Sequence, residues 1–102
     1  MQTTGQLQVD QDALAGFCGK WGIGELSVFG SVLRDDFGPN SDIDVLIDLL
    51  PASACSLWDM PEMADELATL FGRKADLVFK GGLRNPFLRR EILGSRQVLY
   101  AA

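Results

Sequence analysis

The residues best suited to chemistry are two carboxylates one residue apart, Asp42 and Asp44, at the start of a short apolar run. In a β-strand successive side chains point to opposite faces, so these two acids share one face while Ile43 points to the other. Like charges at this spacing raise each other's proton affinity, and a cation between them relieves the repulsion. Oxygen-only ligands select a hard ion, so the pair predicts a site for magnesium or manganese.

A glycine-serine pair, Gly30 and Ser31, follows an apolar run that predicts a strand over residues 25–29. Glycine lets the backbone turn sharply and approach a ligand closely, and Ser31 is placed to cap a short helix through about Asp36. The free N–H groups of a first helical turn form an anion site that suits phosphate. N–H groups that can bind phosphate and a carboxylate pair that can bind magnesium therefore meet at the strand ends. A site that binds a nucleoside triphosphate needs both.

The pattern of Gly30-Ser31, a ten-residue spacer and Asp42-Ile43-Asp44 resembles the signature of the DNA polymerase β-like nucleotidyltransferase superfamily. Within that superfamily the chain resembles the minimal nucleotidyltransferases of the MNT type, the antitoxin half of HEPN/MNT toxin–antitoxin pairs. The resemblance extends from about Leu26 to Tyr100. Further matching motifs fall in the family's order, namely Arg34, Asp36 and residues 72–78, 90–93 and 98–100.

The resemblance adds a third acid to the pair. Asp76 interrupts an apolar run at a place where a plain core strand would carry an aliphatic residue. An isolated strand aspartate is usually just exposed, but three acids in this order are better explained by a shared metal centre. The resemblance thus implies that Asp42, Asp44 and Asp76 hold Mg²⁺, with Mn²⁺ as a possible substitute, and that Asp76 accepts the proton of an acceptor hydroxyl.

The resemblance also assigns the phosphate side of the site. It implies that the Gly30 backbone and Ser31 bind the β and γ phosphates of ATP, the nucleotide donor, and that Arg34 holds the loop or a phosphate. Two positions depart from the family pattern, because Val32 and Asp35 stand where many relatives carry an arginine and a glycine. Loss of the arginine is expected to weaken triphosphate binding.

As to function, the resemblance implies an antitoxin enzyme that transfers AMP from ATP to a tyrosine of a partner HEPN-family ribonuclease toxin and so silences it. Two alternatives remain open. One is an antitoxin that neutralises the toxin by binding alone. The other is a small-molecule nucleotidyltransferase of the aminoglycoside type, which would need a partner subunit because this chain lacks the helical substrate-binding domain of such enzymes.

Composition limits the other function classes. The sequence contains no histidine, which excludes a Ser-His-Asp triad and the usual zinc sites. Two cysteines do not make a disulfide framework. The formal net charge of −5 repels nucleic acid, so a macromolecular partner is expected to be a protein and not DNA or RNA.

Length and hydrophobic patterning predict one nucleotidyltransferase domain over residues 1–102, with residues 1–8 as a flexible tail. No apolar run approaches the length of a membrane span, and the first residues lack the basic and apolar regions of a signal peptide. The sequence therefore predicts a cytoplasmic protein that does not bind membranes.

Capping residues and apolar periodicity predict the elements that position these residues. The fold expected from them is α/β, a small mixed β-sheet of three or four strands with helices packed on one face, as in the palm of the polymerase β-like enzymes. The expected helices are residues 10–22, with residue 24 as the alternative end, 57–71 and 86–94, and the expected strands are residues 25–29, 43–49, 73–79 and 97–100.

Overall fold

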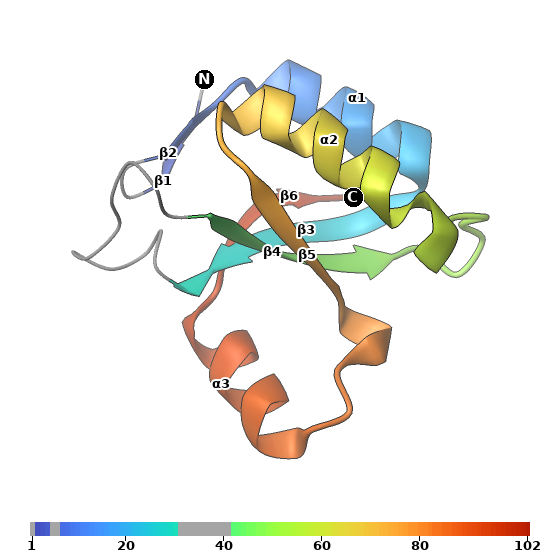
Figure 1. The fold of residues 1–102 in the computed structure, drawn as a ribbon, viewed down its shortest axis with the longest axis vertical. Helices are drawn as coiled ribbons and strands as arrows, with labels where there is room; N and C mark the ends of the chain where they lie inside the picture. The colour runs from blue at the N-terminus through green and yellow to red at the C-terminus, as the bar shows by residue number, and fades with distance from the viewer. Residues whose placement is uncertain (1, 5–6, 31–41) are drawn as a thin grey trace.

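The computed structural model describes residues 2–4, 7–30 and 42–102 (Figure 1). Helices and strands alternate through most of this part of the chain, as the sequence predicts. In chain order the elements are β1 (Gln2–Thr4), β2 (Leu7–Val9), α1 (Gln11–Trp21), β3 (Ile23–Phe29), β4 (Ile43–Leu49), the 3-10 turn η2 (Leu57–Asp59), α2 (Met60–Phe71), β5 (Ala75–Phe79), the 3-10 turn η3 (Lys80–Gly82), α3 (Pro86–Ser95) and β6 (Gln97–Ala101).

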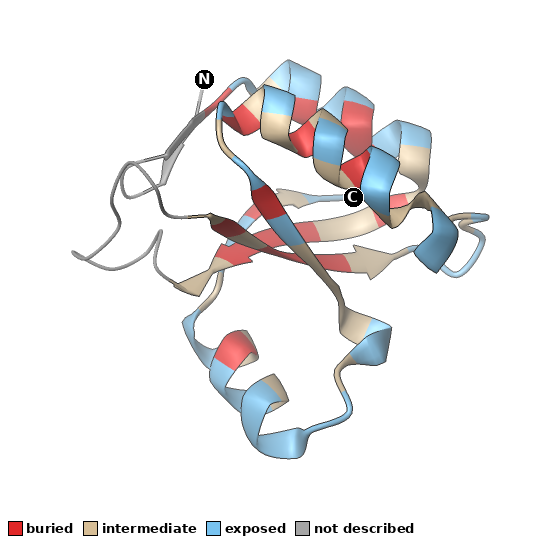
Figure 2. Ribbon diagram, in the orientation of Figure 1, coloured by how far each residue is buried: buried red, intermediate tan, exposed pale blue. Residues whose placement is uncertain are grey.

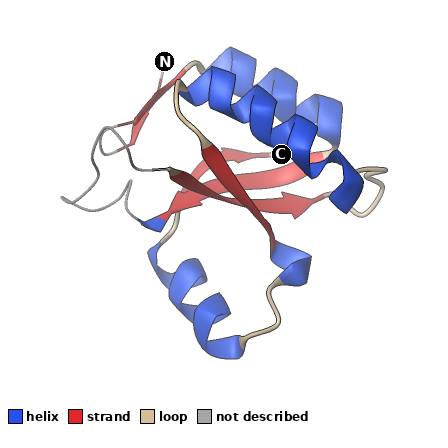
Figure 3. Ribbon diagram, in the orientation of Figure 1, coloured by secondary structure: helices blue, strands red, loops and turns tan. Residues whose placement is uncertain are grey.

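The main sheet has four strands in the order β5-β4-β3-β6. β3 is antiparallel to both of its neighbours, and β4 is parallel to β5. A parallel pair needs a crossover between its strands, and α2 supplies it. The mixed sheet and the α/β class that the sequence predicts are confirmed (Figure 3).

The helices begin and end at residues whose side chains or backbone conformation favour a helix end. Asp10 accepts hydrogen bonds from two N–H groups of the first turn of α1, at 3.0 and 3.3 Å, and Asn85 does the same for α3 at 3.0 and 3.2 Å. Gly22 and Gly72 end α1 and α2 at φ values of 68° and 71°, in the left-handed region that favours glycine. Local chemistry therefore sets the bounds of these helices.

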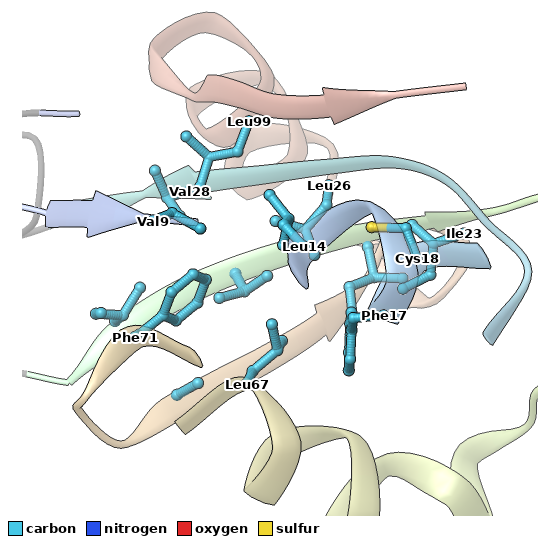
Figure 4. Packing of buried hydrophobic residues seen from close by; sticks show 14 of the residues in the cluster. Val9, Leu14, Phe17, Cys18, Ile23, Leu26, Val28, Leu67, Phe71 and Leu99 are labelled. Atoms are coloured by element: carbon cyan, nitrogen blue, oxygen red, sulfur yellow. The ribbon is translucent and has the colours of Figure 1, made fainter. Parts of the chain in front are cut away.

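The core lies between the sheet and the layer formed by α1 and α2. Figure 4 shows this packing, and Figure 2 shows that the two helices turn their buried sides to the sheet and their exposed sides to solvent. The largest fully buried side chains of the cluster come from both layers: Leu14, Met63 and Leu67 from the helices, and Ile23, Leu26, Ile43 and Ile47 from the strands. No helix within the described ranges is long and apolar enough to cross a membrane.

α3 departs from the expectation that the helices pack on one face. It lies on the side of the sheet opposite α1 and α2 (Figure 1). The chain must pass from β5 at one edge of the sheet to β6 at the other, and α1 and α2 already cover the first face, so α3 crosses the second. It buries only Ile92, while Phe87 is 84% exposed.

Two short strands lie in the stretch where the sequence predicts a flexible tail. β1 and β2 pair as an antiparallel two-stranded sheet with Gln2 opposite Val9. Val9 is buried in the core cluster, which ties β2 to the rest of the fold.

Candidate active site

Gly30 lies directly after β3, beside the carboxylate of Asp44. The register pairs Phe29 with Asp44 across the two antiparallel strands. Gly30 has a φ of 74°, and a Cβ built on it would fall far inside van der Waals distance of Asp44 Oδ2. Both the backbone conformation and the space therefore require glycine here. The close approach that the sequence predicts at Gly30 is an approach to Asp44.

Asp44 and Asp76 are direct neighbours in the sheet. The parallel register of β4 and β5 places these two residues opposite each other, and adjacent strands lie about 4.8 Å apart. The preceding pair, Ile43 and Ala75, is buried in the core on the other face. Asp44 is half-buried and Asp76 is exposed, so the two carboxylates stand side by side on the face away from α1 and α2.

Asp42 lies just before β4, two residues from Asp44, and is half-exposed. Its Oδ2 is 4.0 Å from Nζ of Lys74, the outer limit of an ion pair. The backbone joins the same two segments, because Ile43 N donates to Lys74 O at 2.9 Å. Asp42 is thus held near the start of β5, close to the strand that carries Asp76.

The side chains of Asp42, Asp44 and Asp76 are chemically suited to bind a divalent cation, because carboxylate oxygens are the ligands that Mg²⁺ and Mn²⁺ prefer. The register supplies two of them as neighbours. Among the described residues, however, no three acidic side chains gather closely enough to hold a metal ion. Of the three predicted acids, Asp42 is the one that lies beside Lys74.

Ser31 and Arg34, the predicted phosphate-binding residues after Gly30, lie outside the described residues, as does the short helix expected there. Their roles remain predictions. Val32 and Asp35, the two departures from the family pattern, lie in the same stretch.

A fourth acid, Asp48, lies on the same strand face as Asp44 but further along β4. Its Oδ2 accepts a hydrogen bond from Lys80 Nζ at 3.3 Å. The ammonium group offsets the charge of this carboxylate, which separates Asp48 from the acid pair. Lys80 is also held in place by its backbone, because its carbonyl accepts from Arg89 Nη1 at 3.3 Å.

Sequence reasoning missed the contacts that Lys74 and Lys80 make with acids. Each pairs with an acid on or next to β4, more than thirty residues earlier, through the β4–β5 register. The register between two strands that lie far apart in the sequence cannot be detected in a local sequence pattern.

Comparison with known proteins supports the resemblance. A family model described as a nucleotidyltransferase domain matches residues 12–99. The chain is 32% identical over 81 residues to the protein adenylyltransferase MntA of Thermococcus cleftensis, and the match covers 79% of this chain and 77% of that protein.

Solved structures share the fold. A toxin–antitoxin complex with AMP-PNP matches with a TM-score of 0.72 and 19% identity, over 92% of this chain and 75% of that one. A complex of the tri-AMPylated Shewanella oneidensis HEPN toxin with its MNT antitoxin matches with a TM-score of 0.59 and 20% identity, over 90% of this chain and 70% of that one. The chain therefore belongs to the nucleotidyltransferase domain family, among its minimal, MntA-type members.

Proposed function

We propose that this chain is a magnesium-dependent protein adenylyltransferase that transfers AMP from ATP to a tyrosine of a HEPN-family toxin, and that it acts as the antitoxin by this reaction. The observation that carries the proposal is the in-register pair of Asp44 and Asp76, with Gly30 against the first carboxylate. The names of the relatives support the protein substrate and the toxin partner, and the AMP-PNP in one neighbour supports a nucleotide substrate.

In the proposed reaction, the oxygen of the acceptor hydroxyl attacks the α phosphorus of ATP. The bond from that phosphorus to the bridging oxygen breaks, and pyrophosphate leaves with the bonding electrons. The hydroxyl proton passes to the carboxylate of Asp76. With no histidine in the chain, a carboxylate is the available base, and the exposed position of Asp76 lets an acceptor reach it.

Asp42, Asp44 and Asp76 would hold the magnesium. When bound, this ion supplies charge neutralisation for the triphosphate and lowers the pKa of the acceptor hydroxyl. Beside the acids, the Gly30 backbone and Ser31 would bind the β and γ phosphates, and Arg34 would hold the loop or a phosphate. Since Gly30 has no side chain, nothing on this residue blocks the approach of a phosphate to Asp44.

Intact mass spectrometry of the partner toxin tests the proposal. The HEPN toxin is co-expressed and purified, then incubated with this chain, ATP and magnesium, beside an Asp42→Ala/Asp44→Ala double variant. We expect the toxin to gain one or more AMP units with the unmodified chain and none with the variant. Peptide mapping of the product then identifies the modified residue, and modification of a residue other than tyrosine would correct that part of the proposal.

A stable complex with no gain in mass would contradict the enzymatic mechanism and favour an antitoxin that works by binding alone. One observation makes this second function worth testing, because Asp42 lies beside Lys74 and the described acids do not form a three-ligand group. In that case the double variant should still inhibit the toxin's ribonuclease activity as well as the unmodified chain does.

A further inference from the structure

A groove of about 610 Å³ runs beside β5, next to the acid pair. One wall is formed by η2 and the start of α2, including Leu57 and Met60, and the other by residues 74–77. Asp76 therefore belongs both to the candidate active site and to this groove. Whatever lies in the groove lies against a residue that we place at the reaction centre.

The β5 side of the groove is a sheet edge. Within the described part of the chain, β4 is the one strand that pairs with β5. Ile43 N donates to Lys74 O, and the backbone groups of successive strand residues point to opposite sides, so Lys74, Asp76 and Val78 turn their N–H and C=O groups toward β4. Ala75 and Leu77 consequently turn theirs toward the groove.

Few features discourage another strand from pairing with this edge. β5 contains no proline and no glycine, and Asp76 is its one charged residue. Apolar side chains form the opposite wall, where Leu57 is 68% exposed and lies beside Met60. An extended polypeptide would find main-chain partners on one side of the groove and apolar contacts on the other.

The geometry of such an added strand leads to the acid pair. Residues opposite one another in a sheet share a face, so the residue opposite Asp76 would point to the face that carries Asp44 and Asp76. The added strand would lie about 4.8 Å beyond β5, a distance that a tyrosine side chain can span. Its hydroxyl would then come within reach of Asp76, the proposed proton acceptor.

We infer that the free edge of β5 and the adjoining groove bind the acceptor segment of the protein substrate as an added β-strand, which presents its hydroxyl to Asp76. This inference rests on the proposed function, because it specifies how the substrate of that reaction is held. Main-chain pairing fixes the register of the segment, and the apolar wall at Leu57 and Met60 selects its sequence.

Two variants and one matched control test the inference in the full chain. Leu57→Asp places a charge in the apolar wall, and Leu77→Pro removes an N–H group that faces the groove without removing one that β4 uses. Phe87→Asp makes the same apolar-to-acid change on α3, away from the groove. Each is assayed for AMP addition to the co-expressed HEPN toxin and, separately, for binding of ATP in the presence of magnesium.

We expect Leu57→Asp and Leu77→Pro to lower kcat/KM for the toxin by at least about tenfold, with ATP affinity unchanged, since burying an unpaired charge or losing a strand hydrogen bond costs about that much. Phe87→Asp should stay within about twofold of the unmodified chain. Equal transfer by all three variants would overturn the edge-binding inference and leave the proposed function intact.

Amide hydrogen exchange measured by NMR separates the two ideas further. In the complex with the toxin, the Leu77 N–H should gain protection, while the Val78 N–H, which faces β4, is protected with or without toxin. If the unmodified chain adds no AMP to the toxin, the proposed function fails, and protection at Leu77 then decides whether the edge binds toxin at all. An unprotected Leu77 in a stable complex would overturn edge binding.

Discussion

The two faces of the main sheet differ in what they bury. On the face covered by α1 and α2, Ile43, Val45 and Ile47 of β4 are all fully buried and belong to one continuous core cluster. On the opposite face, the same strand carries Asp44, Leu46 and Asp48. Only Leu46 of these is buried, and it lies outside that cluster. One strand thus serves two purposes through simple alternation.

The comparison shows how a small domain separates stability from chemistry. The first face supplies most of the apolar burial, so the second face can hold like-charged carboxylates next to each other without an apolar covering. α3 contributes one buried side chain to that second face. Stability and activity should therefore respond to different substitutions.

The largest effect is expected from a change at the acid pair. Asp44→Asn should lower the rate of AMP transfer on the order of a thousandfold, about 4 kcal/mol in transition-state stabilisation, because it removes a charged ligand of the metal. Asp48→Asn, on the same face of the same strand, is the matched control. It should leave the rate nearly unchanged and cost at most about 1 kcal/mol of stability, because it disrupts a surface ion pair with Lys80.

Steady-state transfer rates and urea unfolding curves of both variants measure these two quantities. Equal loss of activity in the two variants would show that the acid face acts as a general electrostatic field and not as a specific site. That outcome would remove the distinction between Asp44 and Asp48 drawn from the β4–β5 register.

A core substitution should separate the two faces in stability. Leu67→Ala, in the α2 wall of the core, should cost about 3 kcal/mol in the free energy of unfolding, because Leu67 is fully buried in a layer that cannot collapse around the cavity. Ile92→Ala should cost less, about 1–2 kcal/mol, because α3 packs against the sheet through this one buried residue and can shift to close the gap. Urea denaturation gives both values, and a larger loss for Ile92→Ala would contradict the stated difference between the faces.

A smaller effect is expected from Cys18, which the core buries completely. Burial raises the pKa of the Cys18 thiol to about 12, well above its ordinary value. The folded state therefore holds this proton where the unfolded state releases it. Stability from this group is complete below about pH 8.5 and declines as the pH rises toward 12, with a slope of up to about 1.4 kcal/mol per pH unit.

Unfolding free energies between pH 8 and pH 11 test this for the unmodified chain and for Cys18→Ala. The variant should lose that part of the slope, although it is less stable at every pH because of the lost packing. Cys55→Ala is the comparison. Burial also raises the pKa of the Cys55 thiol, but Cys55 is only half-buried, so this variant should keep more of the slope than Cys18→Ala. An unchanged slope in Cys18→Ala would show that burial of the Cys18 thiol in the core does not cause the loss of stability at high pH.

Local patterns predicted the elements well because local chemistry determines them. Asp10 and Asn85 cap helices through their own side chains, and Gly22 and Gly72 end helices through their own backbone conformation. The apolar spacing of α1 and α2 likewise identified the core face. For these features a stretch of fewer than about fifteen residues holds all the information that is needed.

Features that depend on pairing between distant segments could not be predicted in the same way. The position of Asp76 opposite Asp44 follows from a parallel register that only the folded sheet defines, and the sequence indicated a shared site for these acids through the family resemblance. The ion pair between Arg96 and Glu25, at 2.9 Å, has the same origin. α3 lies opposite the other helices because α1 and α2 already cover the first face of the sheet. The sequence of α3 itself does not indicate this.

The sheet order also constrains how the protein folds. β3 is a central strand of the main sheet, and one of its two neighbours is β6, which follows it by more than sixty residues. Until β6 pairs, one edge of β3 exposes main-chain N–H and C=O groups that could pair with another chain. The antiparallel β3–β6 pairing therefore both completes the sheet and removes an edge at which partly folded chains could associate.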